Sequence, residues 1–283
     1  MRKVSGFELR VAGFWFLVPG SGFLIAGFRE ESGIRNSRFS KLRTGDRPVA
    51  PTGFNFFGAP SMMLFDLHLH TDYYSSCSAI SPEELIRQAA ALKLDGIAVT
   101  EHGIRWPDEK FDFVRKLAEP HGLILIDAQE IQTYSPKNGM EGEFLVFGVK
   151  KSLGSDFSAK ALVERVHEEG GILIAAHPYK WSRFGKDRYY GAGDRVYELD
   201  LDGIELFHPD HDEEAIIKVR RAMEKMGLPG TGGSDAHQVH EIGACLTLFE
   251  KEVRNEEDLI REIRGGRIQG VENSELKRGG TKK

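Results

Sequence analysis

The chain has 283 residues, of which 40% are hydrophobic and 29% are charged, and its formal net charge is -5. This composition excludes wholesale disorder, and the acidic balance disfavours a broad basic face for nucleic acid or acidic membranes. The two cysteines, Cys77 and Cys245, are too few for a disulfide framework, so we expect a protein of the reducing cytoplasm.

Residues 1–61 differ from the rest of the chain. They carry 9 basic and 4 acidic side chains, against 29 basic and 39 acidic in residues 62–283, and they hold nine of the 18 Phe without a sustained period. The uncharged run 11–28 follows a basic start, as in a signal peptide or anchor, but Pro19, Gly20 and Gly22 interrupt it. We favour a poorly structured extension before a natural start at Met62 or Met63, with one domain over 62–283; a membrane association is not expected.

Apolar runs alternate with amphipathic stretches from residue 63 onward. Strands are expected at 63–69, 95–102, 123–130, 144–149, 171–178, 202–208, 229–237 and 244–250, with an irregular segment at 180–200. Helices are expected at 81–93, 108–119, 158–170, 212–227 and 255–266, with N-caps at Ser81 and Asn255 and stops at Gly170 and Gly227. About seven such units favour a distorted α/β barrel of the (β/α)7, TIM-like kind. An open doubly wound sheet is the alternative, but no GxGxxG or Walker A loop follows a strand.

Ionisable residues gather where these strands end. His68 and His70 close the first strand on one face, Glu101 and His102 close the second, and Glu130 closes the third. Further residues of this kind are Glu143, His177, Asp235 and His237. Because the C-terminal strand ends of a barrel share one rim, we expect these side chains to converge on one mouth.

Imidazoles and carboxylates are ligands for Zn, Mn or Fe(II), and five histidines with several acids exceed what one ion needs. The sequence therefore predicts more than one divalent ion. Adjacent divalent ions suit phosphoester hydrolysis, because they neutralise phosphate oxygens and lower the pKa of a water molecule.

Four ordered motifs resemble the PHP (polymerase and histidinol phosphatase) family. They are FDLHLHT with SPEELI, DGIAVTEHG, AAHP at 175–178 and GGSDAH at 232–237. The resemblance implies a seven-stranded distorted barrel, two to three metal ions, and phosphoesterase or exonuclease activity. It also implies ligand roles by position: His68 and His70 for the first ion, Glu130 as a bridge, His177 for the second, His102 for the third, with Asp235 and His237 completing the set.

The chain departs from the family pattern at three places. Glu101 stands where the family has Asp before His102, and it can orient the imidazole. Glu143 stands where members often have His, and a carboxylate can also bind a metal. The loop after His70 offers only Asp72 and Cys77 as donors, and we expect Cys77 to be a small inert residue.

A phosphate needs cations besides metal ions. The segment HPYKWSRFGKDR offers Arg183 as first choice and Lys180 as second for phosphate oxygens, although a solvated basic loop is the plain alternative. Tyr179 and Trp181 could stack on a base. His208 and His211 lie at the rim as well, where we expect a loop role.

The leading hypothesis is a metal-dependent phosphoesterase. Metal-activated water attacks phosphorus, Arg183 and the ions hold the charge, Asp235 completes the catalytic set, and a water or His237 protonates the leaving group. Small phosphomonoesters such as nucleotides come first as substrates, short single-stranded oligonucleotide 5' ends second, and stable duplex binding is not expected. The alternatives are an amidohydrolase, which usually employs a bridging modified Lys, and a metal-free scaffold module.

Overall fold

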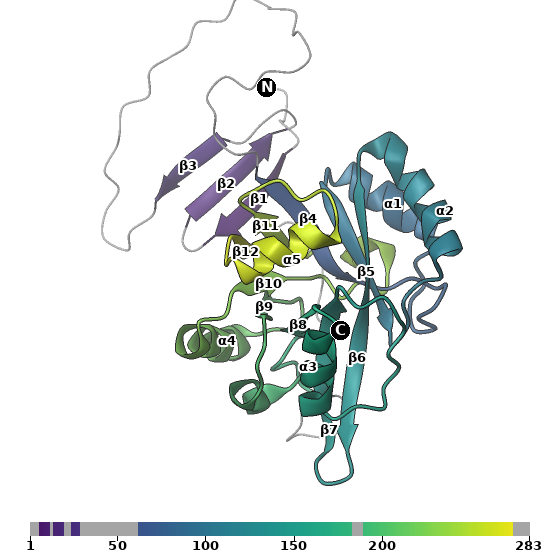
Figure 1. Ribbon diagram of the computed structural model, residues 1–283. Helices are drawn as coiled ribbons and strands as arrows, with labels where there is room; N and C mark the ends of the chain where they lie inside the picture. Colours follow the sequence, from purple (N-terminus) through teal and green to yellow (C-terminus); the bar gives the residue numbers. More distant parts are fainter. Residues whose placement is uncertain (1–5, 12–13, 20–23, 29–61, 183–188, 274–283) are drawn as a thin grey trace, which may run out of the picture.

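The computed structural model describes residues 6–11, 14–19, 24–28, 62–182 and 189–273. Nine strands after residue 62 form a nearly closed, barrel-shaped sheet in the order β10-β9-β8-β7-β6-β5-β4-β11-β12 (Figure 1), so the expected α/β barrel is confirmed. Their bounds are β4 Met63–Leu69, β5 Gly96–His102, β6 Ile124–Ser135, β7 Gly139–Phe147, β8 Ile172–Ala175, β9 Gly203–Phe207, β10 Gly230–Gly232, β11 Cys245–Phe249 and β12 Ile268–Asn273.

Strand direction departs from the seven (β/α) units that were expected. β4, β5 and β6 are parallel, as are β8, β9 and β10, but β7 runs antiparallel to both β6 and β8. β11 is antiparallel to β4 and to β12, a strand that the sequence did not reveal. Only residues 136–138 separate β6 from β7, too few for the crossover of a dozen or so residues that parallel pairing needs. The seven-strand count is therefore not confirmed.

The five helices of the described residues lie on the sheet, and two of them have the N-caps that the sequence predicted. α1 (Pro82–Ala91) and α2 (Asp108–Ala118) pack with β4 and β5, whereas α3 (Ala159–Glu168) and α4 (Glu213–Met226) pack with β7, β8 and β9. Ser81 accepts a hydrogen bond from Glu84 in a capping box, and Asn255 caps α5 (Glu256–Arg264). Gly227 ends α4 in the left-handed conformation.

The apolar interior of the barrel determines which strand residues face the site. Ile126 and Ala128 of β6 join a buried cluster with Leu145 of β7, other strand residues and the apolar face of α5. Side chains alternate along a strand, so Glu130 and Glu143 lie on this same face of β6 and β7, just beyond the apolar residues. The interior thus changes from apolar to ionisable at one end.

The two ends of the barrel sheet come close together at positions that are occupied by glycine. Thr247 Oγ1 in β11 donates to the carbonyl of Gly232 and accepts from its N–H, both at 2.9 Å. A Cβ atom on Gly270 of β12 would lie 2.5 Å from the carbonyl oxygen of Thr231 in β10. Only a residue without a side chain permits this closure.

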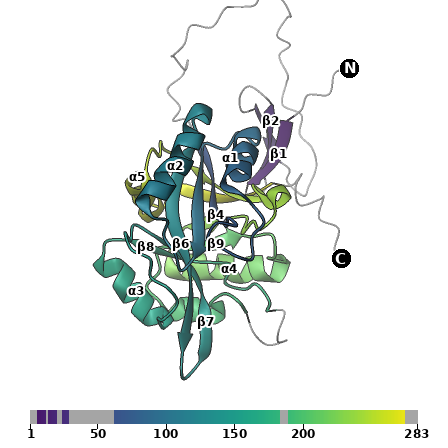
Figure 2. The ribbon, with the colours of Figure 1, turned by 90° about the vertical axis from the view of Figure 1, so that its right-hand side faces the viewer.

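Three further strands precede the barrel in the chain. β1 (Gly6–Val11), β2 (Phe14–Pro19) and β3 (Leu24–Phe28) continue the sheet beyond β12 (Figure 1), with β1 antiparallel to β12. Figure 2 shows β1 and β2 in a second view. Most of residues 1–61 lie outside the described ranges, so the division into an extension and a domain at residue 62 stays a prediction. Within the described ranges, none of the helices has the length and apolar character needed to cross a bilayer.

Candidate metal centre

Four side chains, from strands β4 and β6 and from the segments that follow β4 and β10, point their donor atoms at a common centre. His68 Nε2 lies 3.3 Å from Glu130 Oε1 and 3.5 Å from Asp235 Oδ1. His70 Nε2 lies 3.4 Å from Glu130 Oε2 and 3.3 Å from Asp235 Oδ1. The four residues form one candidate metal group, because their donor atoms lie within 4.8 Å of one another. The structure thus brings these four expected residues together, and their role as ligands stays a prediction.

The spacing of these donors fits a divalent ion. Two donors of one four-coordinate ion, bound at about 2.0–2.2 Å, lie about 3.3–3.6 Å apart. The four distances fall in this range. In addition, His68 Nε2 and His70 Nε2 are buried and have no hydrogen-bond partner, although such atoms are nearly always paired. A cation at the centre would satisfy both nitrogens.

The hydrogen-bond partner of Nδ1 determines the tautomer of the His68 and His70 rings, and therefore whether Nε2 has a lone pair for a cation. His68 Nδ1 lies 3.0 Å from Glu205 Oε1, an oxygen that only accepts, so Nδ1 carries the proton. His70 Nδ1 lies 3.3 Å from Ser75 Oγ, whose hydroxyl donates to Glu101. Without an ion, burial would lower the pKa of His70, but Asp235 and Glu130 outweigh burial and raise the pKa to about 9. A proton therefore competes with the cation for Nε2.

A second set of donors shares Glu130. His177 Nε2 lies 3.0 Å from Glu130 Oε1 and 3.6 Å from Glu143 Oε2, and the three residues form another candidate metal group. Gln132 donates to Glu143 Oε1 at 3.0 Å and orients it. Burial would raise the pKa of the Glu130 carboxyl, yet His68, His102 and His177 hold it well below its usual value. Glu130 is thus an ionised acid in contact with both sets.

Two of these residues adopt strained backbone conformations. His177 has a φ of 27° and Asp235 a φ of 49°, values that residues other than glycine rarely adopt. The backbone N–H of His177 donates to Glu205 Oε2 at 2.7 Å, while the other oxygen of Glu205 holds His68. Such strain persists only where surrounding contacts hold it, and it concentrates at functional sites.

Asp235 also contacts two groups on its far side. Lys180 Nζ lies 2.7 Å and His208 Nε2 lies 3.2 Å from Asp235 Oδ2. The backbone N–H of Asp210 donates to His208 Nδ1, so Nε2 of that ring carries the proton and donates to Asp235. Burial lowers the pKa of His208 to about 4, which keeps the ring neutral.

Comparisons with known proteins identify the family. A model of the PHP domain matches residues 66–186, and a model described as PHP-associated matches residues 214–268. An uncharacterized protein of Methanocaldococcus jannaschii is 30% identical over 167 residues, which are 56% of this chain and 88% of that protein. The chain belongs to the PHP domain family. The resemblance of its motifs is confirmed.

Two further proteins are similar to this chain, one in part of its sequence and one in its fold. A phosphoribosyl 1,2-cyclic phosphate 1,2-diphosphodiesterase of Eggerthella lenta is 35% identical over 79 residues, 28% of each protein. The crystal structure of a two-domain protein from Bacteroides vulgatus, containing a predicted PHP-like metal-dependent phosphoesterase, aligns with a TM-score of 0.59 and 18% identity. It covers 80% of this chain and 69% of that one, and it supports the fold.

Glu101, where the PHP family has Asp, contacts different groups than we expected. Its carboxylate accepts from the hydroxyls of Thr71 and Ser75 and from Trp106 Nε1 at 3.2 Å. Through Ser75 it orients His70, whereas the sequence had assigned it to the adjacent His102. The longer acid thus organises the loop after β4.

His102 and His237 lie at the outer side of the PHP centre. His102 Nδ1 is 3.0 Å from Glu130 Oε2, and His237 Nδ1 is 2.8 Å from the carbonyl oxygen of Asp235. With His70 they form another candidate metal group. The free Nε2 atoms of both rings face Cys77 Sγ, at 3.3 and 3.2 Å.

The structure places the expected substrate-binding residues in different surroundings. Lys180 lies at the centre, but Tyr179 is only 2% exposed, donates to Asp194 at 3.0 Å and packs against Tyr189. This burial contradicts a stacking role for Tyr179, because its ring faces cannot reach a ligand. Trp181 is 48% exposed. Arg183 lies outside the described residues.

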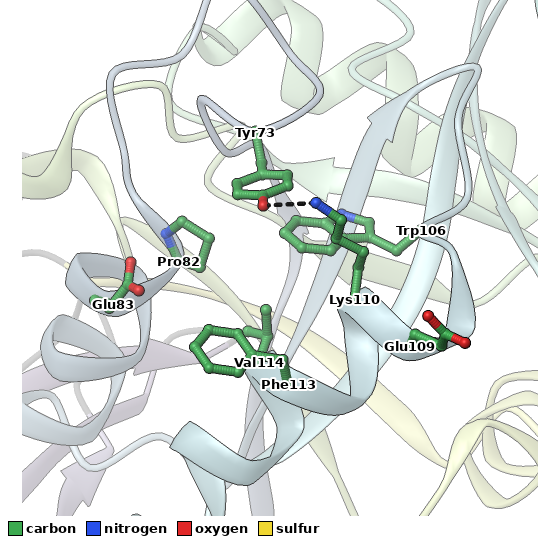
Figure 3. A pocket seen from close by; sticks show the side chains of 8 residues that line it. All are labelled: Tyr73, Pro82, Glu83, Trp106, Glu109, Lys110, Phe113 and Val114. Carbon is green, nitrogen blue, oxygen red and sulfur yellow. Dashed lines mark hydrogen bonds between the residues drawn. The ribbon is translucent and has the colours of Figure 1, made fainter.

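A cavity of about 280 Å³ lies apart from these donors, between the loop after β4 and helices α1 and α2 (Figure 3). Tyr73 stacks on Trp106 with ring centroids 5.1 Å apart, and Lys110 Nζ lies 2.9 Å from the Tyr73 hydroxyl. Because Trp106 also donates to Glu101, the aromatic wall of this cavity is tied to the loop that carries Ser75 and Cys77.

Two residues of the centre, Glu205 and His208, had no predicted role as ligands or positioning groups. Glu205 is the single acid inside the otherwise apolar strand β9, and it is fully buried. A buried carboxylate must be paired, so its presence in an apolar run was a usable signal. His208 follows the same strand and was assigned a loop role, but its ring is buried and holds Asp235.

Proposed function

We propose that this protein is a metal-dependent phosphoesterase that uses metal-activated water. The observation that carries the proposal is the pair of orphaned nitrogens of His68 and His70, spaced from Glu130 and Asp235 as ligands of one ion, beside a second donor set that shares Glu130. Two adjacent divalent ions would neutralise phosphate oxygens and supply hydroxide near neutral pH.

The chain's own residues have distinct tasks in this proposal. Glu205 and Ser75 hold the first two imidazoles in the tautomer that offers Nε2. His208 donates to Asp235 and fixes its carboxylate. Lys180 supplies a cation for phosphate oxygens, with Arg183 as a further candidate. Because Nε2 of His237 faces Cys77, we assign His237 to metal binding and not to proton donation.

Amidohydrolase chemistry is the second candidate, and the amines near the centre speak against it. A bridging carboxylated lysine forms from a neutral amine and would hold two ions through its carbamate oxygens, but the residue that the two donor sets share is Glu130. Burial would lower the pKa of Lys180, yet attraction to Asp235 and the hydrogen bond with it raise the pKa above its usual value. Lys180 therefore stays charged. The scaffold alternative leaves two orphaned buried nitrogens unexplained.

The substrates we propose are small phosphate esters. Nucleoside monophosphates and sugar phosphates come first, and short 5'-phosphorylated single strands second. The Eggerthella lenta relative acts on a cyclic sugar phosphate, so phosphodiesters of that kind belong in the same screen. The excess of acidic side chains after residue 61 disfavours long duplexes, whose binding needs many phosphate contacts.

The test is a phosphate-release screen over these esters with Mn²⁺ or Zn²⁺, run on the natural protein, on His68→Ala and on His121→Ala. His121 is exposed and remote from the centre, which makes it a matched control. We expect activity in the natural protein and in His121→Ala, and a loss of at least about a hundredfold in His68→Ala at unchanged circular dichroism. Equal turnover in His68→Ala would reject the assigned centre, and amide hydrolysis without phosphate release would favour the amidohydrolase.

A further inference from the structure

The cavity beside the loop after β4 has no role in the proposed reaction. Its lining comes from Tyr73 in that loop, from the first turn of α1, and from Trp106 with the first two turns of α2. None of these described residues belongs to a candidate metal group. Figure 3 shows the side chains of Tyr73, Pro82, Lys110 and Val114 around one open space. The cavity is therefore a separate site at the N-terminal ends of two helices.

Two aromatic side chains at this cavity are exposed to solvent. Tyr73 is 48% exposed and Phe113 is 57% exposed, although large aromatic rings usually bury most of their surface. Trp106, which stacks on Tyr73, and Val114 are buried beside them. The cavity thus has apolar walls that a flat ring can cover.

Polar groups with unused hydrogen-bonding capacity lie at the edge of the same cavity. Lys110 Nζ donates to the Tyr73 hydroxyl at 2.9 Å, and among the described residues no carboxylate lies within 4.0 Å of this ammonium group. Two of its three N–H donors are therefore available to a ligand. The carboxylates of Glu83 and Glu109 are exposed at the cavity and have no hydrogen-bond partner in the described part of the chain. Donors and acceptors are both present.

We propose that this cavity binds a nucleobase. Its volume of about 280 Å³ lies at the lower end of the about 300–1,000 Å³ of small-molecule pockets, which suits a single ring system. A base stacks its faces on aromatic side chains, and its edge carries both donors and acceptors. Lys110 donates to a ring nitrogen or carbonyl oxygen, and a carboxylate at the rim accepts from an exocyclic amine. An aliphatic ligand would leave these polar groups unused, and an inorganic anion would leave the apolar walls uncovered.

A chain of hydrogen bonds connects the wall of the cavity to the candidate metal centre. Trp106 Nε1 donates to Glu101 Oε1 at 3.2 Å, and Glu101 also accepts from the Ser75 hydroxyl. Ser75 Oγ lies 3.3 Å from Nδ1 of His70. A base that packs against Trp106 therefore acts on the position of His70. The base can belong to the substrate itself or to a separate molecule, and the two sources are distinguished below.

The first test measures binding and needs no turnover. Adenosine, guanosine, cytidine and uridine carry no phosphate, and ribose serves as the ligand without a base. We expect calorimetry to show saturable binding of a nucleoside at one equivalent and none of ribose. Phe113→Ala and Lys110→Met should each weaken this binding at least about tenfold, as expected for the loss of a stacked ring or a donor. Both side chains are exposed, so the variants should keep the circular dichroism of the natural protein.

Two matched variants control for general effects of these substitutions. Tyr134, at the end of β6, is an aromatic residue that is 59% exposed, and Lys116 is an exposed lysine of α2 that does not line the cavity. Tyr134→Ala and Lys116→Met should bind the nucleoside like the natural protein. Absence of saturable binding for all four nucleosides at millimolar concentration, or equal affinity in Phe113→Ala and Tyr134→Ala, overturns the site.

The second test identifies the source of the base, and it rests on the proposed phosphoesterase function. If the base is part of the substrate, Phe113→Ala should raise the KM for a nucleoside monophosphate at least about tenfold and leave the KM for a sugar phosphate unchanged. If it is a separate molecule, the nucleoside should change the turnover of the sugar phosphate in the natural protein but not in Phe113→Ala. Neither response would overturn the connection to the centre. A failed phosphatase screen leaves the binding result standing, so the two failures are distinguishable.

Discussion

At the scale of single residues, the candidate centre depends on a carboxylate that is not itself in a candidate metal group but contacts two residues that are. Glu205 holds the His68 ring through Nδ1 and the His177 backbone through its other oxygen. Burial would raise the pKa of Glu205, but attraction to His68 and their hydrogen bond keep the pKa below its usual value. It is therefore an ionised positioning residue behind two candidate ligands.

Replacing Glu205 by Gln should weaken metal binding without abolishing the reaction. Partners of this kind typically contribute about 10–100-fold to metal affinity. We expect Glu205→Gln to require that much more Mn²⁺ or Zn²⁺ for half-maximal activity and to approach the natural kcat at saturating metal. Titration of activity and equilibrium dialysis would measure this, with the exposed Glu214→Gln as control. An unchanged metal requirement would contradict the positioning role.

The motif residues could be predicted from the sequence because strand-end placement needs no knowledge of partners. His68, His70, Glu130, His177 and Asp235 follow apolar runs, and the structure brings their donor atoms together. The direction of a loop side chain, by contrast, depends on the packing around it. This is why Tyr179 was assigned to substrate although its ring is buried in the core.

At the scale of elements, the closure of the sheet depends on the approach of β12 to β10. Helices and buried strands could be predicted from period and caps, as for Ser81 and Asn255. β12 could not, because its sequence IQGVEN has no apolar run and becomes a strand only by pairing with β11. The pairing of β6 with β7 likewise depends on a short turn and not on propensity.

Gly270→Ala should therefore open this closure. Its Cβ would meet the Thr231 carbonyl at 2.5 Å, whereas a Cβ on Gly203 of β9 would find its nearest atom at 3.4 Å, an ordinary contact. We expect Gly270→Ala to lower the free energy of unfolding by about 1–3 kcal/mol, as overpacking does, and Gly203→Ala to lower it by less. Urea denaturation would compare the two. Equal stability of both variants would show that the closure tolerates a side chain.

At the scale of the whole molecule, a partly buried ion cluster joins distant segments. Arg105 Nε lies 3.2 Å from Asp127 Oδ2 in β6, and Arg105 Nη1 lies 3.3 Å from Glu256 at the start of α5. Burial raises the pKa of Asp127 from its ordinary 3.8 to about 7, although Arg105 acts to lower it. Ionisation of Asp127 therefore lowers the stability of the folded state.

Stability should consequently fall as pH rises across this window. The folded chain keeps the Asp127 proton to higher pH than the unfolded chain, so between about pH 4 and 7 the unfolded state binds fewer protons. At about 1.4 kcal/mol per pKa unit, the loss is on the order of 4 kcal/mol at most. Urea denaturation of the metal-stripped protein between pH 5 and 8 should show a steeper decline than Asp127→Asn. Parallel profiles would contradict the raised pKa.

The metal centre should stabilise the whole fold as well, because its ligands come from β4, β6 and β7 and from the segments after β8 and β10. Gathering ionised Glu130 and Asp235 around buried imidazoles costs free energy that a bound cation offsets.

A ligand at a hundred times its Kd adds about 2.7 kcal/mol to the free energy of unfolding, which corresponds to a Tm rise of about 5–10 °C for a chain of this size. Chelation should lower the Tm by that amount and Zn²⁺ or Mn²⁺ should restore it, as followed by scanning calorimetry. In His68→Ala the metal-dependent shift should shrink, whereas His121→Ala should keep it in full. If the natural protein has the same Tm with metal and with chelator, the cation does not stabilise the fold by holding these segments together.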